Sequence, residues 1–223
     1  MKKLTFTLVL LFATSAFAQK SFDLKDASKF FDIKVTVEKC DDMYCRGKAT
    51  YSFYKKGGTT PYQTINVADT LVELAEGGQP EVNVSMLYDK QSAVNVGDFD
   101  FDGMEDVAIC DGDNGPYGSP HYAIYLSSRA AKKFVYNAAF TKTLVGLGMF
   151  DVDKDKKRLI VSNKSGCCWH TSEQYSVVNN QPVKVYQFIE DATIQDETKV
   201  KETTKVLVNG KWKTTVKYVK REN

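Results

Sequence analysis

Residues 94–110 have the sequence Val-Asn-Val-Gly-Asp-Phe-Asp-Phe-Asp-Gly-Met-Glu-Asp-Val-Ala-Ile-Cys, and this stretch decides the expected fold. The β-rich flanks at 94–96 and 107–109 predict two strands joined by an acidic loop. Gly103 permits a sharp turn after the third Asp of the spacing Asp-x-Asp-x-Asp-Gly-x-x-Asp. The stretch therefore predicts a hairpin of an antiparallel all-β protein.

The same loop is a candidate calcium site, because carboxylates at alternate positions can supply the oxygen ligands that Ca²⁺ prefers. Without a cation, carboxylates this close would repel one another, which favours a bound ion over a solvated acidic turn. An EF-hand is excluded because the twelfth loop position is Ile109, where a bidentate Glu is needed. The expected ligands are the side chains of Asp98, Asp100, Asp102 and Asp106 and the peptide carbonyl of Met104.

A second segment repeats the carboxylate spacing of this loop. Residues 151–155 are Asp-Val-Asp-Lys-Asp, but Lys156 replaces the Gly and Leu159 replaces the closing Asp. We interpret it as a repeat that has lost its metal, with neighbouring lysines neutralising the carboxylates. Repeated loops and regularly spaced strands predict a propeller-like antiparallel fold, with a β-sandwich as the alternative.

Other patterns predict individual elements. Alternating apolar residues predict strands over 31–37, 49–53 and 82–86, and residues 69–75 are expected to form a short helix. The tail predicts a hairpin over 203–218 with a type I′ turn at Asn209-Gly210. Its second strand has Trp212, Thr214, Val216 and Tyr218 on one face.

The first eighteen residues have the features of a secretory signal peptide. Lys2 and Lys3 precede an apolar run at 4–13, and Ala16-Phe17-Ala18 forms the cleavage site. The run is too short to span a bilayer, and no later segment is apolar enough to do so. We expect export to a bacterial periplasm, or alternatively to the outside medium, of one all-β domain spanning residues 19–223.

Charge and cysteine content fit an exported protein. The two leader lysines account for the formal net charge of +2, so nucleic-acid binding is not expected of residues 19–223. Five cysteines in an oxidising compartment favour disulfides, with one thiol left over. Cys40 and Cys45 are the first expected pair. Cys167 and Cys168 could pair with each other, or one of them with Cys110.

Residues 164–170, Lys-Ser-Gly-Cys-Cys-Trp-His, combine several reactive side chains, and three interpretations are open. A Zn²⁺ site would use both cysteines, His170 and His121, although an oxidising compartment removes thiolates. A structural interpretation places a disulfide here and Trp169 in the core. The third is a rigid binding loop, with Trp169 as an anchor and His170 as a chargeable donor.

The segments 98–103, 114–118 and 164–170 together resemble a family of small bacterial periplasmic proteins. Members carry one FG-GAP-like calcium loop in a propeller-like fold, and the family includes a periplasmic lysozyme inhibitor. The resemblance covers roughly residues 94–185. It implies a calcium-stabilised binding protein without enzymatic activity, whose partner is a lysozyme-type muramidase.

Residues 165–169, Ser-Gly-Cys-Cys-Trp, are also similar to the Ser-Gly-x-x-Tyr inhibitory loop of other periplasmic lysozyme inhibitors, with Trp in place of Tyr. The expected partner-binding residues are Ser165, Gly166, Trp169 and His170. The Ser hydroxyl, the Gly amide and the imidazole could bond the catalytic carboxylates of a muramidase, while the indole occupies a sugar subsite.

A calcium-dependent adhesion or envelope-assembly module that binds protein or glycan is the alternative function. An enzyme is least favoured, because the chain has two histidines and lacks Gly-x-Ser-x-Gly and His-Glu-x-x-His motifs.

Overall fold

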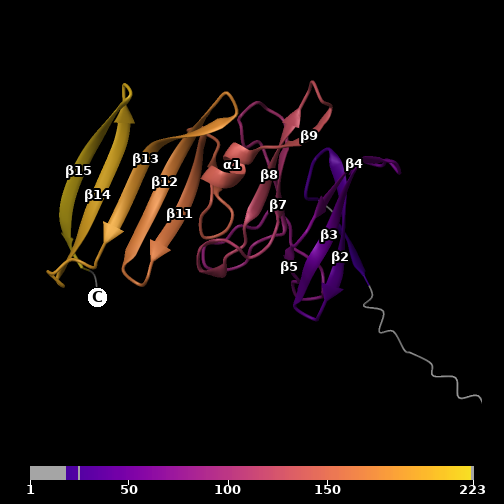
Figure 1. Cartoon of the computed structure of the whole chain (residues 1–223), viewed down its shortest axis with the longest axis horizontal. Coiled ribbons are helices and arrows are strands. Elements are labelled where there is room, and N and C mark those ends of the chain that lie inside the picture. The colour runs from indigo at the N-terminus through magenta and orange to yellow at the C-terminus, as the bar shows by residue number, and fades with distance from the viewer. Residues whose placement is uncertain (1–18, 25, 222–223) are drawn as a thin grey trace, which may run out of the picture.

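Three antiparallel sheets follow one another along the chain, in a row that Figure 1 shows from β2 to β15. The computed structural model describes residues 19–24 and 26–221, so the predicted signal peptide at 1–18 lies outside the described residues. The all-β prediction is confirmed. None of the three sheets closes on itself, and the predicted propeller-like arrangement is not shown.

The first sheet has the order β1-β2-β3-β4, with β5 added to the end of β3. Its strands are β1 (Lys20–Leu24), β2 (Phe31–Cys40), β3 (Tyr44–Lys55), β4 (Pro61–Val67) and β5 (Leu71–Glu73). The expected helix at 69–75 is wrong, because β5 occupies its centre. Pairing with β3 sets Val72 opposite Cys45, and the burial of both residues outweighs the local helical pattern.

The second sheet is a four-stranded meander with the acidic loop at its first turn. Its strands are β6 (Val94–Gly97), β7 (Asp106–Cys110), β8 (Tyr122–Ser128) and β9 (Lys133–Tyr136). The predicted hairpin at 94–110 is confirmed by the pairing of β6 with β7. The expected strand at 82–86 is wrong. Asn83 has a φ of 57°, which breaks the extended backbone, and only Ser85 bridges to Gln91.

The third sheet is the largest, with six strands in sequence order. They are β10 (Asp151–Asp153), β11 (Arg158–Ser165), β12 (Trp169–Val178), β13 (Gln181–Asp191), β14 (Lys199–Val208) and β15 (Lys211–Lys220). The second Asp-rich segment forms β10 and the start of the β10–β11 turn, where the Lys156 ammonium lies 3.2 Å from Asp153 as expected. The tail hairpin is confirmed, with positive φ at Asn209 and Gly210.

Two short helical segments interrupt the strands: the 3₁₀ turn η1 (Pro116–Gly118), between β7 and β8 of the second sheet, and the helix α1 (Ala138–Thr143), between the second and third sheets. The sequence reasoning missed α1. Its start is set by Asn137, whose side-chain oxygen accepts the amide N–H groups of Ala139 and Phe140. Phe140 is fully buried, so the helix fixes the connection between the second and third sheets.

Aromatic contacts join the sheets into one hydrophobic core. Phe134 of β9 lies with its ring centroid 5.0 Å from that of Phe53 in β3. Phe99 of the acidic loop makes an edge-to-face contact with Phe150, which directly precedes β10, at 5.2 Å. Such pairs bury large apolar areas with a defined geometry, so they hold each sheet against the next.

A buried polar chain also links the first two sheets. The Thr70 hydroxyl donates to the Cys110 carbonyl at 2.9 Å, so the Tyr51 hydroxyl must donate to Thr70 Oγ1, 2.7 Å away. Burial raises the pKa of Tyr51 far above its ordinary value, which keeps this hydroxyl protonated.

This series of buried hydrogen bonds predicts that two isosteric substitutions lower the stability by different amounts. Tyr51→Phe removes one hydrogen bond and should lower the free energy of unfolding by about 1 kcal/mol. Thr70→Val leaves the buried Tyr51 hydroxyl and the Cys110 carbonyl without this hydrogen-bond partner, and should lower the free energy of unfolding by about 3 kcal/mol. In the Thr70→Val background, Tyr51→Phe should be neutral or stabilising in urea unfolding, because it removes the hydroxyl that has lost its partner. If the two losses of unfolding free energy add in the double variant, the proposed hydrogen-bond order from Tyr51 through Thr70 to Cys110 is wrong.

Candidate functional site

The acidic loop between β6 and β7 brings three carboxylates together. Oxygen atoms of Asp98, Asp100 and Asp106 all lie within 4.8 Å of one another, so this triad could hold a metal ion. Asp98 and Asp100 are partly exposed, and Asp106 is buried. Burial and the neighbouring Asp102 raise the pKa of Asp100, as expected for carboxylates that share a site.

Asp106 is the centre of the loop. It is 0% exposed, and its carboxylate accepts the amide N–H groups of Phe99 and Ser127, each at 2.8 Å. Burial raises the pKa of Asp106 to about 7, although these two amides act in the opposite direction. A buried carboxylate whose donors are all neutral amides is stabilised in its charged form by a bound cation.

Three of the five expected ligands, Asp98, Asp100 and Asp106, form the triad, and the Asp102 carboxylate lies outside it. The Asp102 carboxylate instead accepts the Met104 amide at 2.8 Å, which tightens the turn. The Asp102 amide donates to Asp98 and Asp100, and the Gly103 amide donates to Asp98. The loop amides thus orient the carboxylates, and the Asp102 carboxylate lies beside that of Asp100, outside the triad.

The cysteines follow the first of the predicted alternatives. Cys40 pairs with Cys45 across the β2–β3 turn, and Cys167 pairs with its neighbour Cys168. Cys110 is left as a buried thiol, and burial raises its pKa to about 11. The zinc interpretation of residues 164–170 is excluded, because both expected thiolates are consumed by a disulfide.

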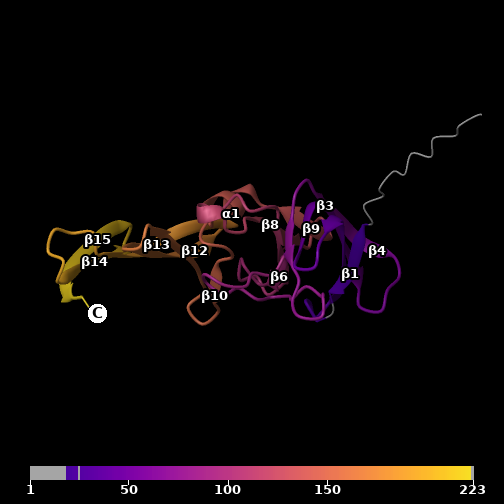
Figure 2. The ribbon, with the colours of Figure 1, turned by 90° about the horizontal axis from the view of Figure 1, so that it is seen from below.

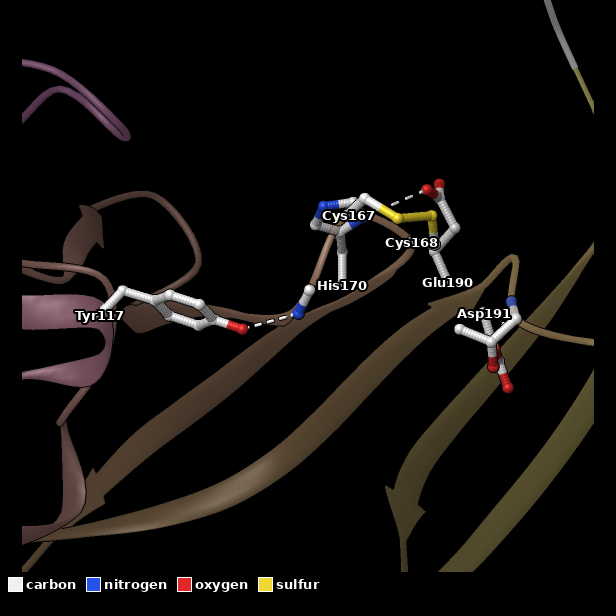
Figure 3. The surroundings of a disulfide bond; sticks show 8 residues. Tyr117, Cys167, Cys168, His170, Glu190 and Asp191 are labelled. Atoms are coloured by element: carbon white, nitrogen blue, oxygen red, sulfur yellow. Dashed lines mark hydrogen bonds and ion pairs between the residues drawn. A yellow bond between two sulfur atoms is a disulfide. The ribbon is translucent and has the colours of Figure 1, made fainter.

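The Cys167–Cys168 disulfide forms the tip of the β11–β12 hairpin (Figure 3). Ser165 pairs with Trp169, and Lys164 pairs with His170. Because strand side chains alternate, Trp169 lies with Ser165 on one face and His170 with Lys164 on the other. The four predicted binding residues therefore share one hairpin tip but are divided between its two faces.

Hydrogen bonds from two other segments fix this tip. The Gly166 amide donates to the Tyr117 hydroxyl at 2.6 Å, as Figure 3 shows, and the Cys168 carbonyl accepts the Ala192 amide at 2.8 Å. On the outer face, His170 Nδ1 lies 3.5 Å from a carboxylate oxygen of Glu190. The tip is thus held by η1 and by the end of β13.

A tyrosine–lysine cluster, formed by Tyr88, Tyr117 and Lys164, extends the surface beside the tip. The Lys164 ammonium lies 4.7 Å from the Tyr88 ring centroid and 5.1 Å from that of Tyr117, within cation–π range. Both tyrosines are exposed, and both have positive φ, which is uncommon for bulky residues. The sequence reasoning missed them, because nothing in the local pattern indicates such a backbone.

Together these features define an all-β protein with three successive antiparallel sheets, an acidic triad that could hold a metal, and a disulfide-tipped hairpin. No protein-family model and no curated protein matches the chain. A solved structure, that of a Xanthomonas type IV secretion system related protein, is similar over 90% of this chain and 94% of that chain. Its TM-score is 0.66 and its sequence identity 22%, so the likeness shows the fold alone.

Two observations bear on the compartment. Within residues 19–24 and 26–221, no helix has the length and apolar character needed to cross a bilayer. Two disulfides are typical of a protein that folds in an oxidising environment outside the cytosol.

Proposed function

We propose that the triad binds Ca²⁺ and that the ion stabilises the hairpin, as the FG-GAP resemblance implies. The supporting observation is the donor set, because three carboxylates converge with no sulfur or nitrogen ligand. A hard cation would reduce the repulsion among the three carboxylates, and it would offset the cost of burying the charged Asp106 side chain. The propeller-like arrangement and the periplasmic location stay predictions of the sequence.

Calcium should therefore raise the melting temperature of residues 19–223, and a chelator should lower it. Asp100→Asn should abolish the calcium-dependent rise, because it removes one converging charge. Asp102→Asn is the matched control. It removes an equal charge from the same loop but from outside the triad, so most of the rise should remain.

The measurement is thermal unfolding of the three proteins in calcium and in chelator. Equal melting temperatures of the unchanged protein in both buffers would contradict the metal assignment. Equal loss in both variants would contradict the division of roles between Asp100 and Asp102.

We further propose that this exported protein inhibits a lysozyme-type muramidase by inserting the 165–170 hairpin tip into its cleft. The observation that carries the proposal is the division of Trp169 and His170 between opposite faces of one fixed tip. A flat partner could contact only one face, whereas a cleft has two walls and receives both. The disulfide and the Tyr117 contact hold the tip before binding, which reduces the entropy lost on association.

The chemistry of a muramidase cleft fits this tip. Such a cleft presents two catalytic carboxylates within a groove that binds sugar rings. The imidazole of His170 and the Ser165 hydroxyl could donate to the carboxylates, and charge-assisted hydrogen bonds are the strong ones. The indole of Trp169 has the size and apolar faces to occupy a sugar subsite.

A lysis assay tests this function. Residues 19–223 should inhibit at least one class among animal-type, goose-type and invertebrate-type lysozymes. Trp169→Ala should weaken inhibition at least about tenfold. Truncation of an aromatic hot-spot residue to Ala costs about 2 kcal/mol or more of binding free energy. Trp212→Ala is the matched control, because it removes the chain's other tryptophan from the distant β15.

His170→Ala should also weaken inhibition, provided that its melting temperature stays unchanged. Inhibition that survives both tip variants would place the contact elsewhere on the molecule. No inhibition of any class would reject the inhibitor function and favour an adhesion or envelope-assembly module, whose partner would then be sought among surface proteins and glycans.

A further inference from the structure

The C-terminal hairpin, β14 and β15, carries a charge opposite to that of the rest of the molecule. Residues 19–198 contain 26 acidic and 20 basic side chains, whereas residues 199–221 contain eight basic side chains and one acidic. The net charge of zero over residues 19–223 conceals this division. Such separation creates a positive field at one end of the molecule, where it can attract an anionic partner.

The hairpin is also the most open part of the fold. It lies at the far end of the molecule from the first sheet, as Figures 1 and 2 show. No residue of β14 or β15 is buried, and the outer edge of β15 pairs with no strand that the structure describes. Each strand is ten residues long, which corresponds to about 33 Å of exposed ribbon.

The strand register places the aromatic and basic side chains on one face. Trp212 lies opposite Leu207, Val216 opposite Thr203, and Tyr218 opposite Lys201. Residues directly opposite each other share a face, so this hairpin face contains four lysines and no acidic residue. Its members are Lys199, Lys201, Thr203, Lys205, Leu207, Trp212, Thr214, Val216, Tyr218 and Lys220.

The side chains of the hairpin face are available for contact. Trp212 is 45% exposed and Tyr218 is 61% exposed. Lys199 forms an ion pair with Asp196 at 2.9 Å. In the part of the chain that the structure describes, Lys205 and Lys220 have no ion-pair partner, so their charges are free to meet an outside anion.

The composition of the hairpin face argues against two kinds of partner, a second copy of this protein and a different protein. A second copy paired along β15 would bring two lysine-rich strands side by side, and like charges across a ladder are destabilising. A protein partner is disfavoured because lysine is depleted in protein–protein interfaces. The combination of Trp, Tyr and Lys is instead that of a membrane–water interface, where aromatic rings lie at headgroup depth and lysines meet lipid phosphates.

We propose that the hairpin face docks on an anionic phospholipid surface, with Trp212 and Tyr218 at headgroup depth and Lys205 and Lys220 on lipid phosphates. This role is separate from the calcium loop and from the 165–170 tip, which lies on a different hairpin. It would hold the protein at the surface of a membrane and leave the tip free.

Vesicle sedimentation tests the proposal with residues 19–223. The protein should sediment with vesicles of phosphatidylcholine mixed with phosphatidylglycerol, stay in solution with phosphatidylcholine alone, and be released by salt. Lys205→Glu/Lys220→Glu should lower partitioning at least about tenfold. The matched control is Lys34→Glu/Lys48→Glu, which makes the same change of net charge on the first sheet and should have little effect.

Fluorescence locates the contact. In a Trp169→Phe variant, Trp212 is the one remaining tryptophan, and its emission should shift to shorter wavelength when anionic vesicles are added. Absence of sedimentation with anionic vesicles would overturn the proposal. Equal losses in both lysine variants, or an unshifted emission from sedimented protein, would also overturn it. Release of the protein from vesicles by a single-stranded oligonucleotide would assign the face to nucleic acid instead.

Discussion

The buried carboxylate of Asp106 is the constraint on which the arrangement of the sheets depends. Amides from the acidic loop and from Ser127 of β8 converge on it, so it fixes the loop against the second sheet. Its neighbour Glu105 accepts the Ser28 hydroxyl and the Lys29 amide, which ties the loop to the segment before β2. On the other side Phe99 packs on Phe150, at the entrance to the third sheet. All three sheets therefore meet at one loop, and a cation that balances its charges would stabilise their mutual positions.

Distance from this loop separates the buried part of the molecule from the open part. The first two sheets and β11 supply most of the buried apolar side chains, whereas β13, β14 and β15 contain no buried residue. The third sheet thus projects from the core as a ribbon, and its two hairpin regions present different chemistry. The β11–β12 tip is fixed by a disulfide and Tyr117, which suits insertion into a cleft. The β14–β15 hairpin is exposed, basic and aromatic, which suits an extended anionic surface.

Much of the fold could be predicted because its signals are local. Alternation gives β2 and β3, the Asp-Gly loop gives the β6–β7 hairpin, and Asn209-Gly210 gives the last turn. The failures arise where distant contacts decide. Residues 71–73 form a strand because β3 offers a free end, and Asn83 leaves the extended region while its side chain bonds Val96 and Ala27. At the triad, the spacing of the Asp residues identified the loop, but it could not show that the Asp102 carboxylate accepts a hydrogen bond from the Met104 amide. Tyr117 joins the tip across 49 residues, a contact that no local pattern encodes.

Residue-resolved amide hydrogen exchange, measured in calcium and in chelator, tests most directly whether the acidic loop ties the sheets together. The amides of Phe99 and Ser127 both donate to Asp106, so both should exchange more slowly in calcium. Amides of the β14–β15 hairpin, which lies at the outer end of the third sheet, serve as the internal reference and should be unchanged. Equal exchange at Phe99 and Ser127 in the two conditions, or slowing confined to Phe99 within the loop itself, would contradict the account.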